Sequence, residues 1–87
     1  MNSNKTNSNT QREIIAAKIH TTPMGADRIR KNLNLDTDDV VSVCRNLISD
    51  RECNLQRRGK NWYCTNKNTV ITVNASSYTI ITAHIVK

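Results

Sequence analysis

The sequence of 87 residues has few of the residues that mark several common classes of protein. Its only glycines are Gly25 and Gly59, so it lacks the glycine-rich loop with which many nucleotide-binding proteins cradle phosphates. No apolar run approaches the roughly 18 to 20 residues that a membrane-spanning helix needs. The first ten residues also lack the apolar stretch of a signal peptide. We therefore expect a protein of the cytoplasm with no membrane partner.

Metal-binding patterns are also missing. Cys44, Cys53 and Cys64 are odd in number, and no cysteine or histidine pair has the spacing of a zinc site. Acidic residues cluster only in the 36–39 segment, where they suit the positive end of a helix dipole better than a magnesium site. We expect reduced, partly buried thiols, no metal and no cofactor.

Negative charge is absent from the C-terminal part of the chain. Thirteen lysines and arginines face seven acidic residues, a net charge of +6, and every acidic residue lies between Glu13 and Glu52. The basic residues that follow Glu52 are Arg57, Arg58, Lys60, Lys67 and Lys87. This asymmetry indicates an anionic partner, with nucleic acid first, although a basic surface that serves only solubility is the alternative. We expect RNA, DNA or a nucleic-acid-binding protein as the partner.

The chain divides into a tail and one domain. Residues 1–11 are polar and of low complexity, which predicts a disordered tail. Residues 12–87 have the length of one small domain. Helices are predicted for 12–20 and for a segment that starts at Thr22 and Pro23 and ends near 33, because threonine is a good N-cap and proline suits the first helical position.

A third helix is predicted from Asp36 as N-cap, with Asp39 three residues later as in a capping box. Alternating residues after 53 then predict four short strands, at about 54–57, 60–65, 69–74 and 78–86. We predict an α+β fold in which two to three N-terminal helices pack on one face of a four-stranded antiparallel meander. Alternation in the last strand directs Ile81, Ala83 and Ile85 toward the helices.

The same alternation places Tyr78, Thr82 and His84 on the open side of the sheet. Cleavage of RNA without metal needs a base, an acid and cations around the phosphate. The candidates for catalysis are His20, Arg28, Thr82 and His84. The candidates for nucleic-acid binding are Lys31, Arg57, Arg58, Lys60, Trp62 and Tyr78, with Trp62 or Tyr63 as a residue on which a base could stack.

Two families of known fold resemble parts of the chain. The segments "REIIAAKIH", "PMGADRIRKNLNL", "DTDDVVSVCRNLI" and "CNLQRRGKNWYCT" resemble a winged helix over residues 12–65, which implies DNA binding through the third helix. The segments "HTTPMGADRIRKNL" and "TIITAH" resemble the small ribonuclease toxins of the barnase, colicin and RelE type over residues 20–86. That resemblance implies His20, Arg28, Thr82 and His84 as active-site positions.

A third resemblance is more specific. The blocks "RRGKNWY" and "ITVNASSYTIITAH" are similar to a small bacterial domain family whose function is not assigned, over about residues 20–86. It implies that the polar tail lies outside the domain, and it implies no activity.

Three hypotheses for the function remain open. The protein is a metal-independent endoribonuclease of the toxin type, or a non-catalytic binding module such as a winged-helix-like regulator or a mobile-element-encoded inhibitor of a nucleic-acid enzyme. The third hypothesis is a structural domain that pairs through a strand edge, and the sequence does not specify an oligomeric state. The separation of His20 and His84 distinguishes the first hypothesis from the second, because an acid and a base must reach the same phosphate.

Overall fold

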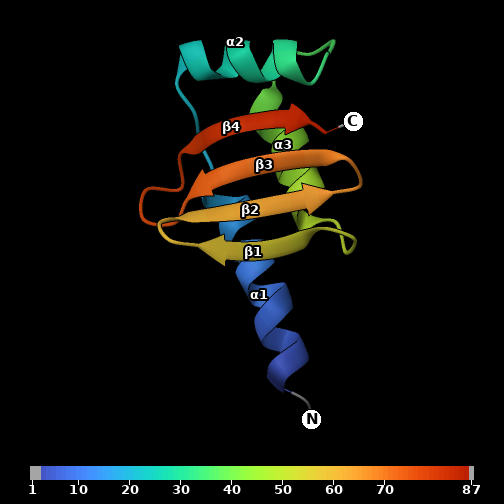
Figure 1. Cartoon of the computed structure of the whole chain (residues 1–87), viewed down its shortest axis with the longest axis vertical. Helices are drawn as coiled ribbons and strands as arrows, with labels where there is room; N and C mark the ends of the chain where they lie inside the picture. Colours follow the sequence, from blue (N-terminus) through green and yellow to red (C-terminus); the bar gives the residue numbers. More distant parts are fainter. Residues whose placement is uncertain (1–2, 87) are drawn as a thin grey trace.

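The fold has three helices followed by one four-stranded sheet (Figure 1). The computed structural model describes the backbone of residues 3–86 and the side chains of residues 11–86. The elements are α1 (Ser3–Lys18), α2 (Pro23–Asn32), α3 (Val40–Ser49), β1 (Asn54–Arg58), β2 (Asn61–Asn66), β3 (Thr69–Asn74) and β4 (Ile80–Ile85). The strands follow one another as an antiparallel meander in the order β1-β2-β3-β4. The predicted α+β architecture is therefore confirmed, with three helices.

The helices leave one face of the sheet uncovered. In Figure 1 this open face is toward the viewer, α1 and α3 lie behind the sheet, and α2 runs along the β4 edge. The most deeply buried side chains come from α1, α3 and the two inner strands, and include Ile15, Ile48, Cys64, Ile71 and Val73. Because the core lies only on the helix side, every residue that alternates with it on β2 and β3 points to the open face.

The start of α2 agrees with the prediction, and the start of α3 does not. Thr22 is the N-cap of α2, and its Oγ1 accepts a hydrogen bond from the backbone nitrogen of Gly25 at 3.0 Å. The N-cap of α3 is Asp39, not Asp36. Starting at this point places Val40, Cys44 and Ile48, four residues apart, on the single buried side of the helix.

The structure begins α1 at Ser3, inside the segment that we expected to be a disordered tail. Residues 1 and 2 of that segment lie outside the described residues. The first turns of α1 extend below the sheet in Figure 1. No apolar residue occurs in the sequence from Ser3 to Thr10, and among the described side chains of α1, Ile15 and Ala16 are buried.

A bulge in β4 changes the predicted burial of that strand. Thr82 pairs with Thr72 and Ile80 pairs with Val73, so the residue between them on β4, Ile81, has no partner on β3. Ile80 and Ala83 are buried, whereas Ile81 is 51% exposed. The prediction for Ala83 is confirmed, and the prediction for Ile81 is wrong because strict alternation does not allow for an extra residue.

Ile85 was also predicted to face the helices, but it is 40% exposed at the end of β4.

The two outer strands are protected in different ways. On β4, the Asn32 side chain of α2 donates a hydrogen bond from Nδ2 to the carbonyl oxygen of Ala83 at 3.2 Å. On β1, Arg57 and Arg58 place two charges on the free edge. Both features oppose pairing with a second sheet, so they do not favour the hypothesis of a domain that assembles through a strand edge.

The N-cap of α3 can be tested by comparing two aspartates. Asp39 Oδ1 accepts from the Ser42 backbone nitrogen at 3.3 Å, and Ser42 Oγ donates to Asp39 Oδ2 at 2.8 Å. We expect Asp39→Ala to lower the midpoint of thermal unfolding by about 4–8 °C, which is the effect of losing one N-cap in a domain of this size. Asp36→Ala, which removes a carboxylate three residues earlier, is expected to leave the midpoint unchanged.

The pH dependence follows from the same contacts. The hydrogen bonds from Ser42 hold the pKa of Asp39 below its ordinary value of 3.8. Because the folded pKa is lowered, the stabilisation is complete above pH 3.8 and is lost as the pH falls through the lowered pKa. Thermal unfolding monitored by circular dichroism at several pH values measures the effect of each substitution and its pH dependence. An equal decrease of the unfolding midpoint in Asp39→Ala and Asp36→Ala would contradict Asp39 as the N-cap.

Candidate functional site

The open face of the sheet consists of three rows of side chains that run across the strands. Residues directly opposite one another in an antiparallel pair share a face, so the register defines the rows. They are Asn54, Thr65, Val70 and His84; Gln56, Tyr63, Thr72 and Thr82; and Arg58, Asn61 and Asn74. The face holds no acidic residue, because the last one in the sequence, Glu52, precedes β1.

Tyr63 lies in the middle row on β2, with Arg58 beside it. The Arg58 guanidinium is 5.3 Å from the centre of the Tyr63 ring, a distance at which the cation interacts with the face of the ring. Arg58 also donates from Nη2 to Gln56 Oε1 at 3.1 Å. An aromatic ring on an acid-free surface, with a guanidinium held next to it, suits a planar, negatively charged ligand such as a nucleotide.

The structure places Trp62 differently from our interpretation of the sequence. Trp62 pairs with Val73, which is buried, and it packs against the hydrophobic core on the helix side of the sheet. Arg57, its neighbour on β1, lies 5.6 Å from the Trp62 ring and donates from Nε to the Gly59 carbonyl oxygen. Trp62 and Arg57 therefore lie on the opposite side of the sheet from Tyr63 and Arg58.

Sequence reasoning considered Tyr63 but did not select it. The signal that identifies it is the burial of Cys64, the next residue on β2, which directs Tyr63 to the other face. From the sequence alone, either Trp62 or Tyr63 could face the helices, and the burial of Cys64 decides between them.

His20 joins the α1–α2 connection to the start of β4. Its backbone pairs with Thr79: the nitrogen donates to the Tyr78 carbonyl oxygen at 3.2 Å, and the carbonyl oxygen accepts from the Ile80 nitrogen at 2.8 Å. Its side chain shares a hydrogen bond of 3.0 Å between Nε2 and Thr79 Oγ1. His20 thus lies on the open face, at the end where β4 begins.

The two histidines are at opposite ends of β4. His20 is fixed beside Thr79, whereas His84 lies five positions further along the same strand and pairs with Val70. At the rise of a β-strand, these five positions correspond to about 15 Å. The open face thus carries both imidazoles, and Thr82 between them, without bringing the imidazoles to one point.

Arg28 and Lys31 lie on α2, beside β4. Arg28 is exposed, and it shares a side of the helix with Asn32, which hydrogen-bonds β4. Lys31 forms an ion pair with Asp27 at 3.1 Å, which neutralises part of its charge. Arg28 thus lies on the side of α2 that faces β4, whereas Lys31 is paired with Asp27.

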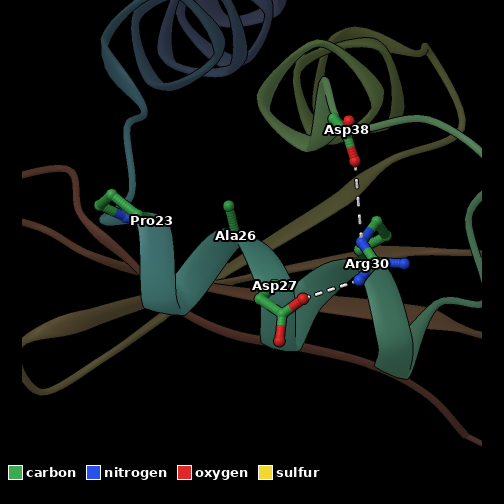
Figure 2. Close-up of a pocket in the computed structure, with 5 residues that line it drawn as sticks. All are labelled: Pro23, Ala26, Asp27, Arg30 and Asp38. Carbon is green, nitrogen blue, oxygen red and sulfur yellow. Dashed lines mark hydrogen bonds and ion pairs between the residues drawn. The ribbon is translucent and has the colours of Figure 1, made fainter.

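A depression of about 240 Å³ lies on the other side of α2, lined by Pro23, Ala26, Asp27, Arg30 and Asp38. Figure 2 shows Arg30 between the two aspartates, with ion-pair distances of 2.7 Å to Asp27 and 3.9 Å to Asp38. The hydrogen bonds from Arg30 and Lys31 lower the pKa of Asp27. Because its charges are already paired, this depression has little attraction for an anion.

Tyr78 is not on the open face. It packs against the hydrophobic core, and the Lys18 ammonium lies 5.3 Å from the centre of its ring. Its backbone has a φ of 61°, a left-handed conformation that is rare for a bulky residue. The prediction that Tyr78 lies on the open side of the sheet is thus wrong, and its predicted contact with nucleic acid stays a prediction.

The three cysteines are free and buried, as the sequence indicated. Burial raises the pKa of the Cys44 thiol to about 11, and a hydrogen bond with Cys53 together with burial raises the pKa of Cys64. These thiols act as core residues.

Within residues 11–86, no three histidine, cysteine or acidic side chains are grouped so that they could hold a metal ion. None of the described helices combines the length and the apolar character that crossing a membrane requires.

The chain belongs to the family described as protein of unknown function (DUF3781), whose match spans residues 13–84. This agrees with the resemblance to a small domain family without an assigned function, and the polar residues before 13 lie outside the match. No curated protein and no solved structure matches the chain. The resemblances to ribonuclease toxins and to winged helices therefore gain no support from known proteins.

The different positions of the two neighbouring aromatics predict different effects on stability. We expect Trp62→Ala to lower the free energy of unfolding by about 2–4 kcal/mol, because it removes packing from the core. Tyr63→Ala, which removes a residue of the open face, is expected to cost less than about 1 kcal/mol. Urea unfolding of both variants measures the difference, and a larger loss for Tyr63→Ala would contradict the assignment of the two faces.

Proposed function

We propose that this member of the DUF3781 family is a non-catalytic module that binds single-stranded nucleic acid, RNA in the first place, on the open face of its sheet. The observation that carries the proposal is the position of Tyr63 in the middle row of an acid-free sheet face, with the Arg58 guanidinium 5.3 Å from its ring. A base can stack on the ring when the Arg58 side chain turns from the ring to the adjoining phosphate.

The distribution of charge around the face supports an extended anionic ligand. Arg58 is on β1, Lys60 is in the turn to β2, and Arg28 is on α2 beside β4, so cations occur at both edges of the sheet. Four adjacent strands span about 14 Å, which is enough for a few nucleotides laid across them. The polar residues of the face between these cations, such as Thr82, add hydrogen-bonding groups without adding negative charge.

An open sheet face favours a single strand over a duplex. Duplex DNA is read by an element that enters a groove, usually a helix. The helix that a winged-helix protein would use corresponds here to α3, whose N-terminal side carries Asp36, Asp38 and Asp39 and whose other side is buried against the core. These carboxylates would repel phosphates. Bases of a single strand, in contrast, are free to stack on an aromatic ring that is half-buried on a sheet face, such as Tyr63.

The separation of the histidines supports binding without catalysis. A general acid and a general base must each come within hydrogen-bond distance of the same reacting group. With about 15 Å between the backbone positions beside His20 and at His84, both imidazoles cannot reach one phosphate of a bound strand. The endoribonuclease hypothesis is therefore the less favoured of the two, and cytoplasmic action remains our expectation from the sequence.

Binding can be tested with fluorescently labelled oligonucleotides. We expect Tyr63→Ala to weaken binding of a single-stranded RNA by about 5- to 100-fold, the effect of losing one stacked base, and Tyr63→Phe to retain binding. Fluorescence anisotropy measures the affinity, and circular dichroism confirms that the variants are folded. Undiminished binding by a folded Tyr63→Ala protein would contradict the proposal.

Salt dependence separates the two neighbouring arginines. We expect Arg58→Gln to reduce the slope of log affinity against log salt concentration by about 0.7, the value for one lost phosphate contact to a single strand. Arg57→Gln is the matched control and should change the slope less, because Arg57 lies over Trp62 on the helix side. Binding that does not depend on salt would indicate a protein partner instead of a nucleic acid.

Catalysis is tested independently of binding. We expect the wild-type protein to leave RNA intact in the presence of EDTA, and His84→Ala to behave in the same way. Gel analysis of a labelled RNA after prolonged incubation provides the measurement. Cleavage by the wild type that is lost in His84→Ala would favour the endoribonuclease hypothesis.

A further inference from the structure

A chain of hydrogen-bonded polar side chains crosses the open face at the end where β4 begins. Asn74 Oδ1 accepts from Ser77 Oγ at 3.2 Å, Ser77 Oγ lies 2.9 Å from Thr79 Oγ1, and Thr79 Oγ1 lies 3.0 Å from His20 Nε2. These hydrogen bonds thus connect β3, the β3–β4 loop and the α1–α2 connection. We call these four residues the polar chain.

We propose that the polar chain is a binding site for a phosphate monoester, namely the terminal phosphate of the nucleic acid strand. The two hydroxyl groups can rotate to donate hydrogen bonds to phosphate oxygens, and an imidazole can donate from Nε2 when it is protonated. This inference rests on the proposed function, because the rest of the strand would lie on the open face.

The surroundings of the polar chain carry positive charge. Lys60 is attached to the same loop, because the backbone nitrogen of Ala75 donates to the Lys60 carbonyl oxygen at 2.8 Å. The loop and strands that contribute Asn74, Ser77 and Thr79 belong to the acid-free part of the sequence. A doubly charged phosphate would therefore meet hydroxyl groups and no carboxylate here, with Lys60 attached to the same loop.

The loop holds the hydroxyl groups in place. Asn74 Oδ1 also accepts hydrogen bonds from the backbone nitrogens of Ser76 and Ser77, both at 2.9 Å. Tyr78 takes its left-handed conformation between Ser77 and Thr79, while its ring packs against the core. A strained residue of this kind persists only where the surrounding structure fixes it, so the two hydroxyl groups keep their positions relative to His20.

The position relative to Tyr63 fits the end of a strand. Thr72 lies opposite Tyr63, and Asn74 is two residues further along β3, which places Asn74 about 8 Å from Tyr63. When the terminal base stacks on Tyr63, its phosphate can therefore reach the polar chain without an intervening nucleotide.

Oligonucleotides that differ only at their ends test this site. We use one single-stranded RNA with a 5′-phosphate, with a 3′-phosphate or with neither, and measure affinity by fluorescence anisotropy. We expect one phosphorylated form to bind about tenfold more tightly than the unphosphorylated form, the effect of one or two charge-assisted hydrogen bonds. Equal affinity for all three RNAs would overturn the phosphate site and leave the proposed function intact.

Matched variants assign the preference to the polar chain. Thr79→Val keeps the shape of the side chain and removes the hydroxyl group, and Thr79→Ser keeps the hydroxyl group. We expect the preference to disappear in Thr79→Val and in His20→Ala, and to remain in Thr79→Ser and in His84→Ala, the histidine at the other end of β4. A preference that survives in folded Thr79→Val and His20→Ala proteins would place the phosphate elsewhere and reject the site.

Inorganic phosphate tests the polar chain as a phosphate site if no RNA binds, a result that would reject the proposed function and the strand as the source of the phosphate. We expect phosphate to shift the imidazole NMR signals of His20 more than those of His84, and to lose this effect in Thr79→Val. Equal shifts of the two histidines would overturn the phosphate site as well.

Discussion

The burial of Cys64, Ile71 and Val73 against α1 and α3 is the constraint on which the rest of the structure depends. Each of these residues loses nearly all of its exposure to water on the helix side of β2 or β3. Because side chains on a strand alternate, this burial also determines which residues point the other way. The open face is thus a direct consequence of the core, and Tyr63 lies on it because Cys64 is buried.

The same one-sided packing separates the charges of the protein. The last acidic residue is Glu52, just before the sheet, and two of the acidic residues form hydrogen bonds or ion pairs within the helical part. Asp39 caps α3, and Asp27 pairs with Arg30 and Lys31 on α2. The sheet carries cations and no carboxylates. In the proposed function, this charge attracts an anion over a distance, and Tyr63 is the short-range contact for that anion.

The helices protect the sheet as well as cover it. The hydrogen bond from Asn32 to Ala83 and the pairing of His20 with Thr79 occupy backbone groups on the outer side of β4. The backbone of His20 therefore attaches the α1–α2 connection to the sheet. This attachment explains the distance between the two histidines, because His20 is fixed where β4 begins and His84 lies near the other end of the strand.

The sequence by itself determined the order and type of the elements. The Thr22–Pro23 pair specified the start of α2, and local alternation with short polar turns specified four strands, because these signals depend only on neighbouring residues. The sequence also placed Thr82 and His84 on the open face and Ala83 inside. The charge asymmetry, too, is readable from the sequence alone.

Only the tertiary structure decided which candidates lie together. The bulge in β4 exposes Ile81, and the core requires α3 to begin after Asp39. Trp62 and Tyr63 are equivalent in the sequence, and packing against the helices distinguishes them. The contact of His20 with Thr79 joins residues 59 positions apart in the chain, and it determines the distance between His20 and His84. No local pattern encodes such contacts, because they form only when the helices and the sheet pack together.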